Sequence, residues 1–142
     1  MIPMMFYHFC GEDVCTTAED VKVVLQKEIH GVNEFHITSS VESAYPYLSI
    51  LVNRDFAYLF YMPQEDSDIA GFQAYEEENE LDLDPDGVTL FSVNTPTEEL
   101  EVSNELVCSK EKATQVILAF MEQSQWPSCM EELPNCVQWE EL

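Results

Sequence analysis

Residues 47–62 constrain the fold more than any other part of this sequence. Two runs rich in β-branched and aromatic residues, 48–52 and 56–61, flank the short polar segment Asn53-Arg54-Asp55. Runs of this composition favour strands, and a short polar connection between two of them is typical of a β-hairpin. The second run is apolar on both faces, as expected of a central strand that helices cover. We therefore predict an antiparallel sheet built around this hairpin.

Five other segments predict strands, and they lie on both sides of the hairpin along the chain. They are residues 2–9, 35–38, 71–75, 88–93 and 136–140, with a weaker candidate near Leu106-Val107. Residues 11–13 are predicted to form a loop, and residues 94–97 a turn, because both segments are polar.

Two segments carry apolar residues at helical spacing: Val21, Val24, Leu25 and Ile29, and then Ala113, Val116, Ile117, Phe120 and Met121. Thr16 and Glu19 have capping-box spacing, and Gly31 is expected to end the first helix near His30. Ser109 is the predicted N-cap of the second helix, which fades near Gln125. The order of elements predicts one α+β domain over residues 1–142, with two α-helices packed on a mainly antiparallel β-sheet.

The charge of the chain is strongly unbalanced, with 28 Asp and Glu against five Lys and Arg, a formal net charge of -23. The apolar share of 46% is ordinary, so the chain should fold rather than behave as an acidic disordered tail. Nucleic acids and anionic membranes are poor partners, because phosphate recognition needs a basic surface. The charge indicates a binder of something basic.

The expected location is the cytoplasm. Residues 1–7 are apolar, but no basic region precedes them and Glu12-Asp13 follow, which argues against a signal peptide. No run approaches the length of a membrane span.

Five cysteines make an odd number, and reduced, mostly buried thiols are expected in this compartment. A zinc site is the alternative, with Cys10 and Cys15 separated by four residues and Cys129 and Cys136 by six. The second spacing exceeds that of a usual zinc knuckle. Cys108 is the fifth cysteine. We assign no metal or cofactor.

An acidic run fills the segment between two predicted strands. Its carboxylates are Glu76, Glu77, Glu78, Glu80, Asp82, Asp84 and Asp86, and Asp66 and Asp68 add to their field. The run is either a solvated hairpin tip or a surface that enters a basic groove of a partner, and we expect the partner contact to centre on its carboxylates. Residues 82–87 match the first six positions of an EF-hand loop, but Val93 holds position twelve, where calcium needs a Glu. We predict no tight calcium site.

His8 and Cys10 are the one candidate pair for nucleophilic catalysis, because neighbouring strand positions could bring them together. Such a pair also needs an orienting acid and an oxyanion hole, and a structural role for both residues is the alternative. The sequence contains no nucleophile elbow, phosphate loop or HExxH motif, so we assign no catalytic residue.

The aromatic residues divide into two groups. Tyr58, Phe60, Tyr61 and Phe72 are expected in the core or on a sheet face. Trp126 and Trp139 lie in the polar C-terminal region, where exposed tryptophans among carboxylates would be good partner contacts, and partial burial of each ring is the alternative.

Taken together, several of these segments resemble the bacterial immunity proteins of polymorphic toxin systems, of the Imm-one type. The similar segments are residues 47–61, the Gly71-Phe72 pair, the strand 88–93, the later helix and the ending Cys136-Val137-Gln138-Trp139. The resemblance covers about residues 35–142. This chain has Asn53-Arg54-Asp55 where the family pattern has Asn-Gly-Asp, and residues 126–135 form a longer link.

The resemblance implies a non-enzymatic antidote that binds and blocks a cognate toxin domain until delivery into a competitor. Toxins of these systems are often deaminases or nucleases with basic grooves, which agrees with the charge. Two other functions stay open from the residues alone: a small acidic enzyme or enzyme subunit that uses His8 and Cys10, and an acidic DNA-mimic decoy without a single cognate partner. The oligomeric state is left open.

Overall fold

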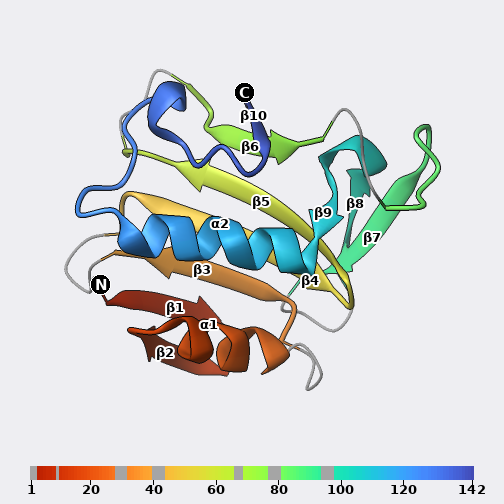
Figure 1. Cartoon of the computed structure of the whole chain (residues 1–142). Coiled ribbons are helices and arrows are strands. Elements are labelled where there is room, and N and C mark those ends of the chain that lie inside the picture. Colours follow the sequence, from red (N-terminus) through yellow and green to blue (C-terminus); the bar gives the residue numbers. More distant parts are fainter. Residues whose placement is uncertain are drawn as a thin grey trace.

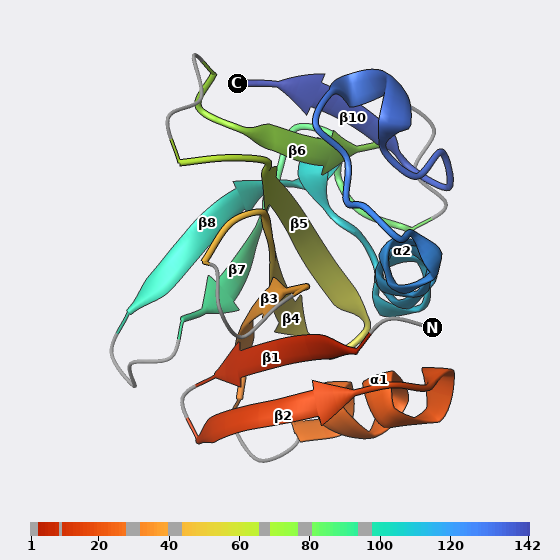
Figure 2. The same cartoon turned by 90° about the vertical axis from the view of Figure 1, so that its left-hand side faces the viewer.

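One antiparallel sheet organises the chain in the computed structural model, which describes residues 3–8, 10–27, 32–39, 44–65, 69–76, 81–93 and 98–142. Two helices cover one face of this sheet, and a two-stranded hairpin projects from the other face (Figures 1 and 2). The predicted α+β class, with a mainly antiparallel sheet and two helices packed on it, is confirmed.

The described elements are ten strands, two α-helices and two 3-10 turns. They are β1 (Met4–His8), β2 (Gly11–Cys15), α1 (Ala18–Leu25), β3 (Glu34–Thr38), β4 (Tyr47–Asn53), β5 (Phe56–Met62), β6 (Phe72–Tyr75), β7 (Val88–Ser92), β8 (Glu99–Ser103), β9 (Cys108–Ser109), α2 (Lys110–Glu122) and β10 (Gln138–Glu141), with 3-10 turns at Asn104–Leu106 and Met130–Glu132. The main sheet has the order β10-β6-β5-β4-β3-β1-β2, and β9 pairs with β5. Strands β7 and β8 pair only with each other among the described strands.

The predicted central hairpin is confirmed as β4 and β5, paired from Tyr47 with Met62 to Asn53 with Phe56. The turn residue Arg54 has a φ of 57°, the positive value that short hairpin turns need. Alternate residues of each strand face the helices, namely Leu48, Ile50 and Val52 in β4 and Ala57, Leu59 and Tyr61 in β5, all of them fully buried.

Both helices bury the apolar stripes that the sequence predicts, as far as the described residues extend. Ser109 caps α2 as expected, because its hydroxyl oxygen accepts from the backbone N–H of Lys112 at 3.0 Å. In α1 the capping box lies one residue later than predicted, on Thr17 and Asp20. This helix ends at Leu25, before the predicted end near His30, and Ile29, His30 and Gly31 lie outside the described residues.

Two polar segments form strands that the sequence analysis missed. Residues 11–13, predicted as a loop, belong to β2, which pairs with β1 at the edge of the sheet and exposes most of its side chains. Strand β8 contains alternating Glu and apolar residues, and only Val102 is buried. Leu106, predicted in a weak strand, ends a 3-10 turn instead. The turn predicted at residues 94–97 lies outside the described residues.

The face of β4 and β5 opposite the helices has a different cover from the one predicted. The β7–β8 hairpin packs against it and forms a second apolar cluster of Leu51, Phe91, Val102 and Val107. The Asn53 side-chain amide donates to the backbone carbonyl of Leu90 at 2.7 Å, which links hairpin and sheet. The expectation that helices cover this central strand is wrong for this face, because both described helices lie on the other side (Figure 2).

The C-terminal segment closes the core above α2 and β5. The Tyr61 hydroxyl donates to the Pro127 carbonyl at 2.5 Å, and burial raises the pKa of Tyr61. The Trp126 ring lies 6.4 Å from that of Tyr61 and 5.0 Å from that of Phe120, measured between centroids.

The two tryptophans are therefore not exposed, and the prediction of their exposure is wrong. Trp126 is 5% exposed and Trp139 is 9% exposed. The Trp139 indole N–H donates to the Pro134 carbonyl at 2.9 Å, so its one polar group is satisfied inside the protein. Their large apolar area is buried in the main core, and neither ring is presented to a partner in this structure.

Replacing Tyr61 by Phe should lower the free energy of unfolding by about 1–2 kcal/mol, because the buried Pro127 carbonyl loses its donor. Urea unfolding followed by Trp fluorescence measures this, since Trp126 packs against Tyr61. The matched control is Tyr7→Phe, half-buried on the opposite sheet face. Equal stability of the two variants would contradict the anchoring role of the Tyr61–Pro127 bond.

Candidate functional site

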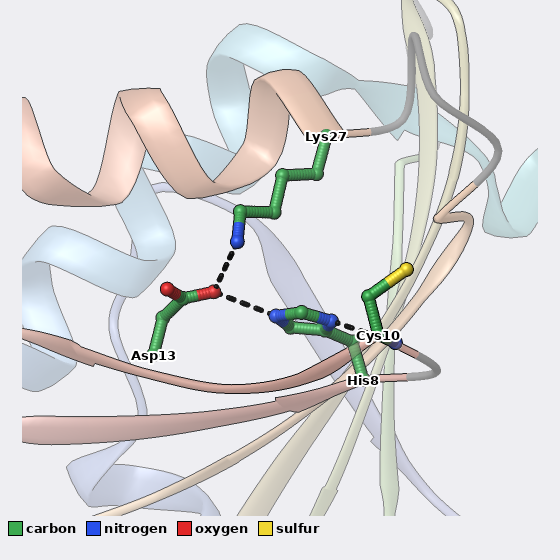
Figure 3. Close-up of polar contacts among 4 residues, drawn as sticks. All are labelled: His8, Cys10, Asp13 and Lys27. Carbon is green, nitrogen blue, oxygen red and sulfur yellow. Dashed lines mark hydrogen bonds and ion pairs between the residues drawn. The ribbon is translucent and has the colours of Figure 1, made fainter.

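The catalytic candidate His8 lies at the end of β1 and meets Asp13 from the neighbouring strand β2 (Figure 3). Its side chain is 1% exposed, and Nε2 lies 2.6 Å from Oδ2 of Asp13. The Lys27 ammonium, just after α1, donates to the same oxygen at 2.8 Å. The cluster thus ties the β1–β2 hairpin to the end of the first helix.

The hydrogen bonds fix which ring nitrogen of His8 carries the proton. The backbone N–H of Cys10 donates to Nδ1 at 3.2 Å, so Nδ1 is an acceptor. The proton then sits on Nε2 and is donated to Asp13, which makes the imidazole neutral. The pKa of Asp13 is held below its usual range, first because Lys27 donates to its carboxylate and then because His8 also does.

This arrangement does not make a Cys/His nucleophile. A nucleophilic pair needs the sulfur within hydrogen-bond reach of a free ring nitrogen, and both nitrogens of His8 are engaged elsewhere. The Cys10 thiol is exposed and points away from the imidazole in Figure 3. His8 contacts Cys10 only through the Cys10 backbone N–H. The acid that orients His8 is Asp13, and their contact links strands β1 and β2.

The cysteines form no disulfide in the structure. Cys15 and Cys108 are buried, Cys129 and Cys136 are half-buried, and Cys10 is exposed, so fewer are buried than predicted. Burial raises the pKa of both Cys15 and Cys108 to about 12, which leaves them as protonated thiols. Within the described residues, no group of three or more His, Cys, Asp or Glu side chains could hold a metal ion.

The acidic run is a crossover between two sheets and not the tip of a hairpin. Strand β6 belongs to the main sheet, whereas β7 pairs with β8, so the strands on either side of the run are not partners. Glu76 begins the crossover with only 10% of its side chain exposed, and its Oε1 lies 2.7 Å from the ammonium of Lys112. Its backbone N–H donates to the Glu105 carbonyl. Glu76 is therefore a structural carboxylate.

The other acids of the run are placed differently. Asp82, Asp84 and Asp86 are exposed, while Leu81 and Leu83, which alternate with the first two, pack against the second apolar cluster. This alternation aims the three carboxylates at solvent. Glu77, Glu78, Glu80, Asp66 and Asp68 lie outside the described residues.

The turn at residues 82–87 is held by its own backbone and by Asn104. The Asp86 N–H donates to Oδ1 of Asp84, and the Asn104 side-chain amide donates to the Asp84 carbonyl. The residues after Gly87 form strand β7, where an EF-hand would need the rest of its loop and then a helix.

Four of the five cations of the chain lie in the two helices or next to them, a feature that sequence analysis did not find. Lys22 lies in α1, Lys27 follows it, and Lys110 and Lys112 lie in the first turn of α2. The fifth, Arg54, is in the β4–β5 turn. Lys22 and Lys110 line an open groove of about 510 Å³ between the helices, together with Gln26, Asp55, Glu111, Thr114 and Gln115. Residues far apart in the sequence make this groove, so no local pattern signals it.

Comparison of the sequence with protein-family models gives no match, and neither does comparison with curated proteins. Among the described residues, no helix has the length and apolar character needed to span a membrane.

Replacing Asp13 by Asn should lower the free energy of unfolding by about 1–3 kcal/mol at pH 7, since a buried imidazole N–H and Lys27 lose a charged acceptor. Because the folded-state pKa of Asp13 is below 3.8, its stabilisation is present above that pH and is lost as the pH falls through the lowered pKa. The difference between the two proteins should therefore shrink at acidic pH.

Urea titrations at a series of pH values measure this difference. The control is Asp82→Asn, an exposed carboxylate, for which the change should stay within about 0.5 kcal/mol. A difference between wild type and Asp13→Asn that stays constant well below pH 3.8 would contradict the paired carboxylate.

Proposed function

We propose that this chain is an immunity protein, which binds a cognate toxin domain with a basic surface and inhibits it by stoichiometric occlusion of the active site. The observation that carries the proposal is the net charge of -23. The placement of Lys22, Lys27, Lys110 and Lys112 on or next to the helices supports it, because the positive charge is not spread over the acidic surface. The resemblance to immunity proteins points to the same function.

A binding role is also supported over the enzymatic alternative. The His8 ring nitrogens are bonded to Asp13 and to the Cys10 backbone, which leaves no base for the Cys10 thiol. The toxin would be a nucleic-acid-acting deaminase or nuclease, since a groove that binds phosphates also attracts carboxylates. The inhibitor would act in the cytoplasm, where the toxin is made.

The negative charge of such an inhibitor would raise its rate of association with the toxin. Attraction between an acidic binder and a basic groove acts over a Debye length of about 8 Å at physiological salt. Steering of this kind can raise association rates to about 10⁸ M⁻¹s⁻¹ or more at low salt, against roughly 10⁵–10⁶ without it. Fast association matters for an antidote, because free toxin damages the cell that makes it.

The test uses the toxin domain encoded by the neighbouring gene, purified and titrated with this protein in an activity assay. We expect complete inhibition at one inhibitor per toxin and an association rate that falls by about tenfold or more from low to high ionic strength. Two unrelated basic nucleases serve as controls and should keep their activity. Equal inhibition of all three enzymes would favour the DNA-mimic decoy, and full toxin activity at excess inhibitor would contradict the proposal.

A further inference from the structure

The face of the main sheet opposite the helices is covered only in part by described elements. The β7–β8 hairpin packs over the end of β4 and β5 that holds Leu51, Phe56 and Tyr58. Towards the other end of these strands, Tyr47, Ser49 and Phe60 point to the same face and are half-buried. Neither α1 nor α2 lies on this side of the sheet (Figure 2).

A single row of paired residues crosses this face from one edge of the sheet to the other. Each is the direct cross-strand partner of the next, and in order they are Glu12, Tyr7, His36, Ser49, Phe60, Gln73 and Glu140. Directly paired residues of antiparallel strands point to the same face. The row therefore places a carboxylate at each edge of the sheet and aromatic rings near the middle, around the small side chain of Ser49.

A second row beside it consists of Val14, Met5, Thr38, Tyr47 and Met62. Tyr47 joins the two rows, because its ring stacks on His36 at 4.2 Å and lies 6.2 Å from the ring of Phe60, measured between centroids. Val14 is 56% exposed, a large value for an apolar side chain on a sheet. Met5 and Thr38 of the second row are buried, at 7% and 2% exposed, and the ring of Tyr45 lies 5.4 Å from that of Tyr47, measured between centroids. The other members of the two rows form an aromatic and apolar surface, which we call the open sheet face.

The charge of the open sheet face has one sign. The Tyr58 hydroxyl donates to Oε1 of Gln73 at 2.8 Å, and the Gln73 amide donates to Glu140 at 2.6 Å, which holds that carboxylate at the margin. Burial lowers the pKa of His36, against a smaller opposite effect of Glu34, so its ring is neutral at pH 7. Neither row contains a Lys or Arg.

We infer that the open sheet face is the surface that receives a cationic protein partner, an inference that rests on the proposed function. Arginine side chains of the partner would stack on the rings of Tyr47 and Phe60, while Glu12 and Glu140 pair with cations at the edges. Arg over an aromatic ring is favourable, and neighbouring carboxylates add to the attraction. A second copy of this chain is a poor occupant, because two chains of charge -23 repel each other.

The test compares three variants that each add one positive charge. Ser49→Arg fills the middle of the open sheet face, and Met62→Arg changes the second row at the end of β5. The matched control is Gln115→Arg on the exposed side of α2, which lies on the other side of the sheet. Circular dichroism and urea unfolding show which variants keep the fold. Ser49→Arg and Met62→Arg change different rows of the open sheet face, so either of them can test the inference if the other fails to fold.

The probe is a fluorescent deca-arginine peptide, whose affinity is measured by anisotropy. Ser49→Arg and Met62→Arg should each weaken binding by about tenfold or more, whereas Gln115→Arg should change it by no more than about twofold. Deca-lysine should bind wild type more weakly than deca-arginine, because lysine stacks less well on aromatic rings. That preference should disappear in Ser49→Arg.

Three results would overturn the inference: no peptide binding to wild type, equal affinity in all three variants, or a dimer in sedimentation that Ser49→Arg abolishes. The peptide assay needs no toxin, so it separates the two proposals. Peptide binding at the open sheet face without toxin inhibition would refute the immunity function alone. Equal toxin inhibition by wild type and Ser49→Arg would refute the assignment of the surface alone.

Discussion

The β4–β5 hairpin is buried over much of both its faces, and the rest of the structure depends on that burial. On one side Leu48, Ile50 and Leu59 lie in the apolar cluster that includes the two helices. On the other side Leu51 packs in the cluster that includes the β7–β8 hairpin. Burial on both sides matters more in this chain than in most, because a net charge of -23 makes the compact state repel itself. Apolar contact, which does not depend on charge, has to offset that repulsion.

The same layering explains where the charges lie. The helices carry most of the few cations, and two of these, Lys27 and Lys112, hold segments together through Asp13 and Glu76. The open sheet face carries a carboxylate at each edge, half-buried aromatic rings between them, and no Lys or Arg in its two rows. Both ion pairs thus use lysines on or next to the helices, whereas the carboxylates of the open sheet face, Glu12 and Glu140, remain for a basic partner.

The sequence allowed the central hairpin, the stripe of α2 and its Ser109 cap to be predicted, because each depends on local periodicity. The ends of α1 and the strands β2 and β8 could not be predicted, since their residues are polar and their pairing comes from distant partners. The exposure of Trp126 and Trp139 was predicted wrongly for the same reason. Their neighbours in the sequence are polar, but the residues that bury them come from distant parts of the chain. The open sheet face escaped prediction because its rows join residues from seven different strands.

The central claim is that an acidic, aromatic sheet face meets a basic protein. Carbene footprinting of this chain, alone and mixed with the toxin domain of the neighbouring gene, tests it most directly. The account predicts that labelling of Tyr7, Tyr47 and Phe60 falls in the complex while labelling of Gln115 and Leu118 on α2 is unchanged. Protection confined to the helices, with the open sheet face labelled as in the free protein, would contradict it.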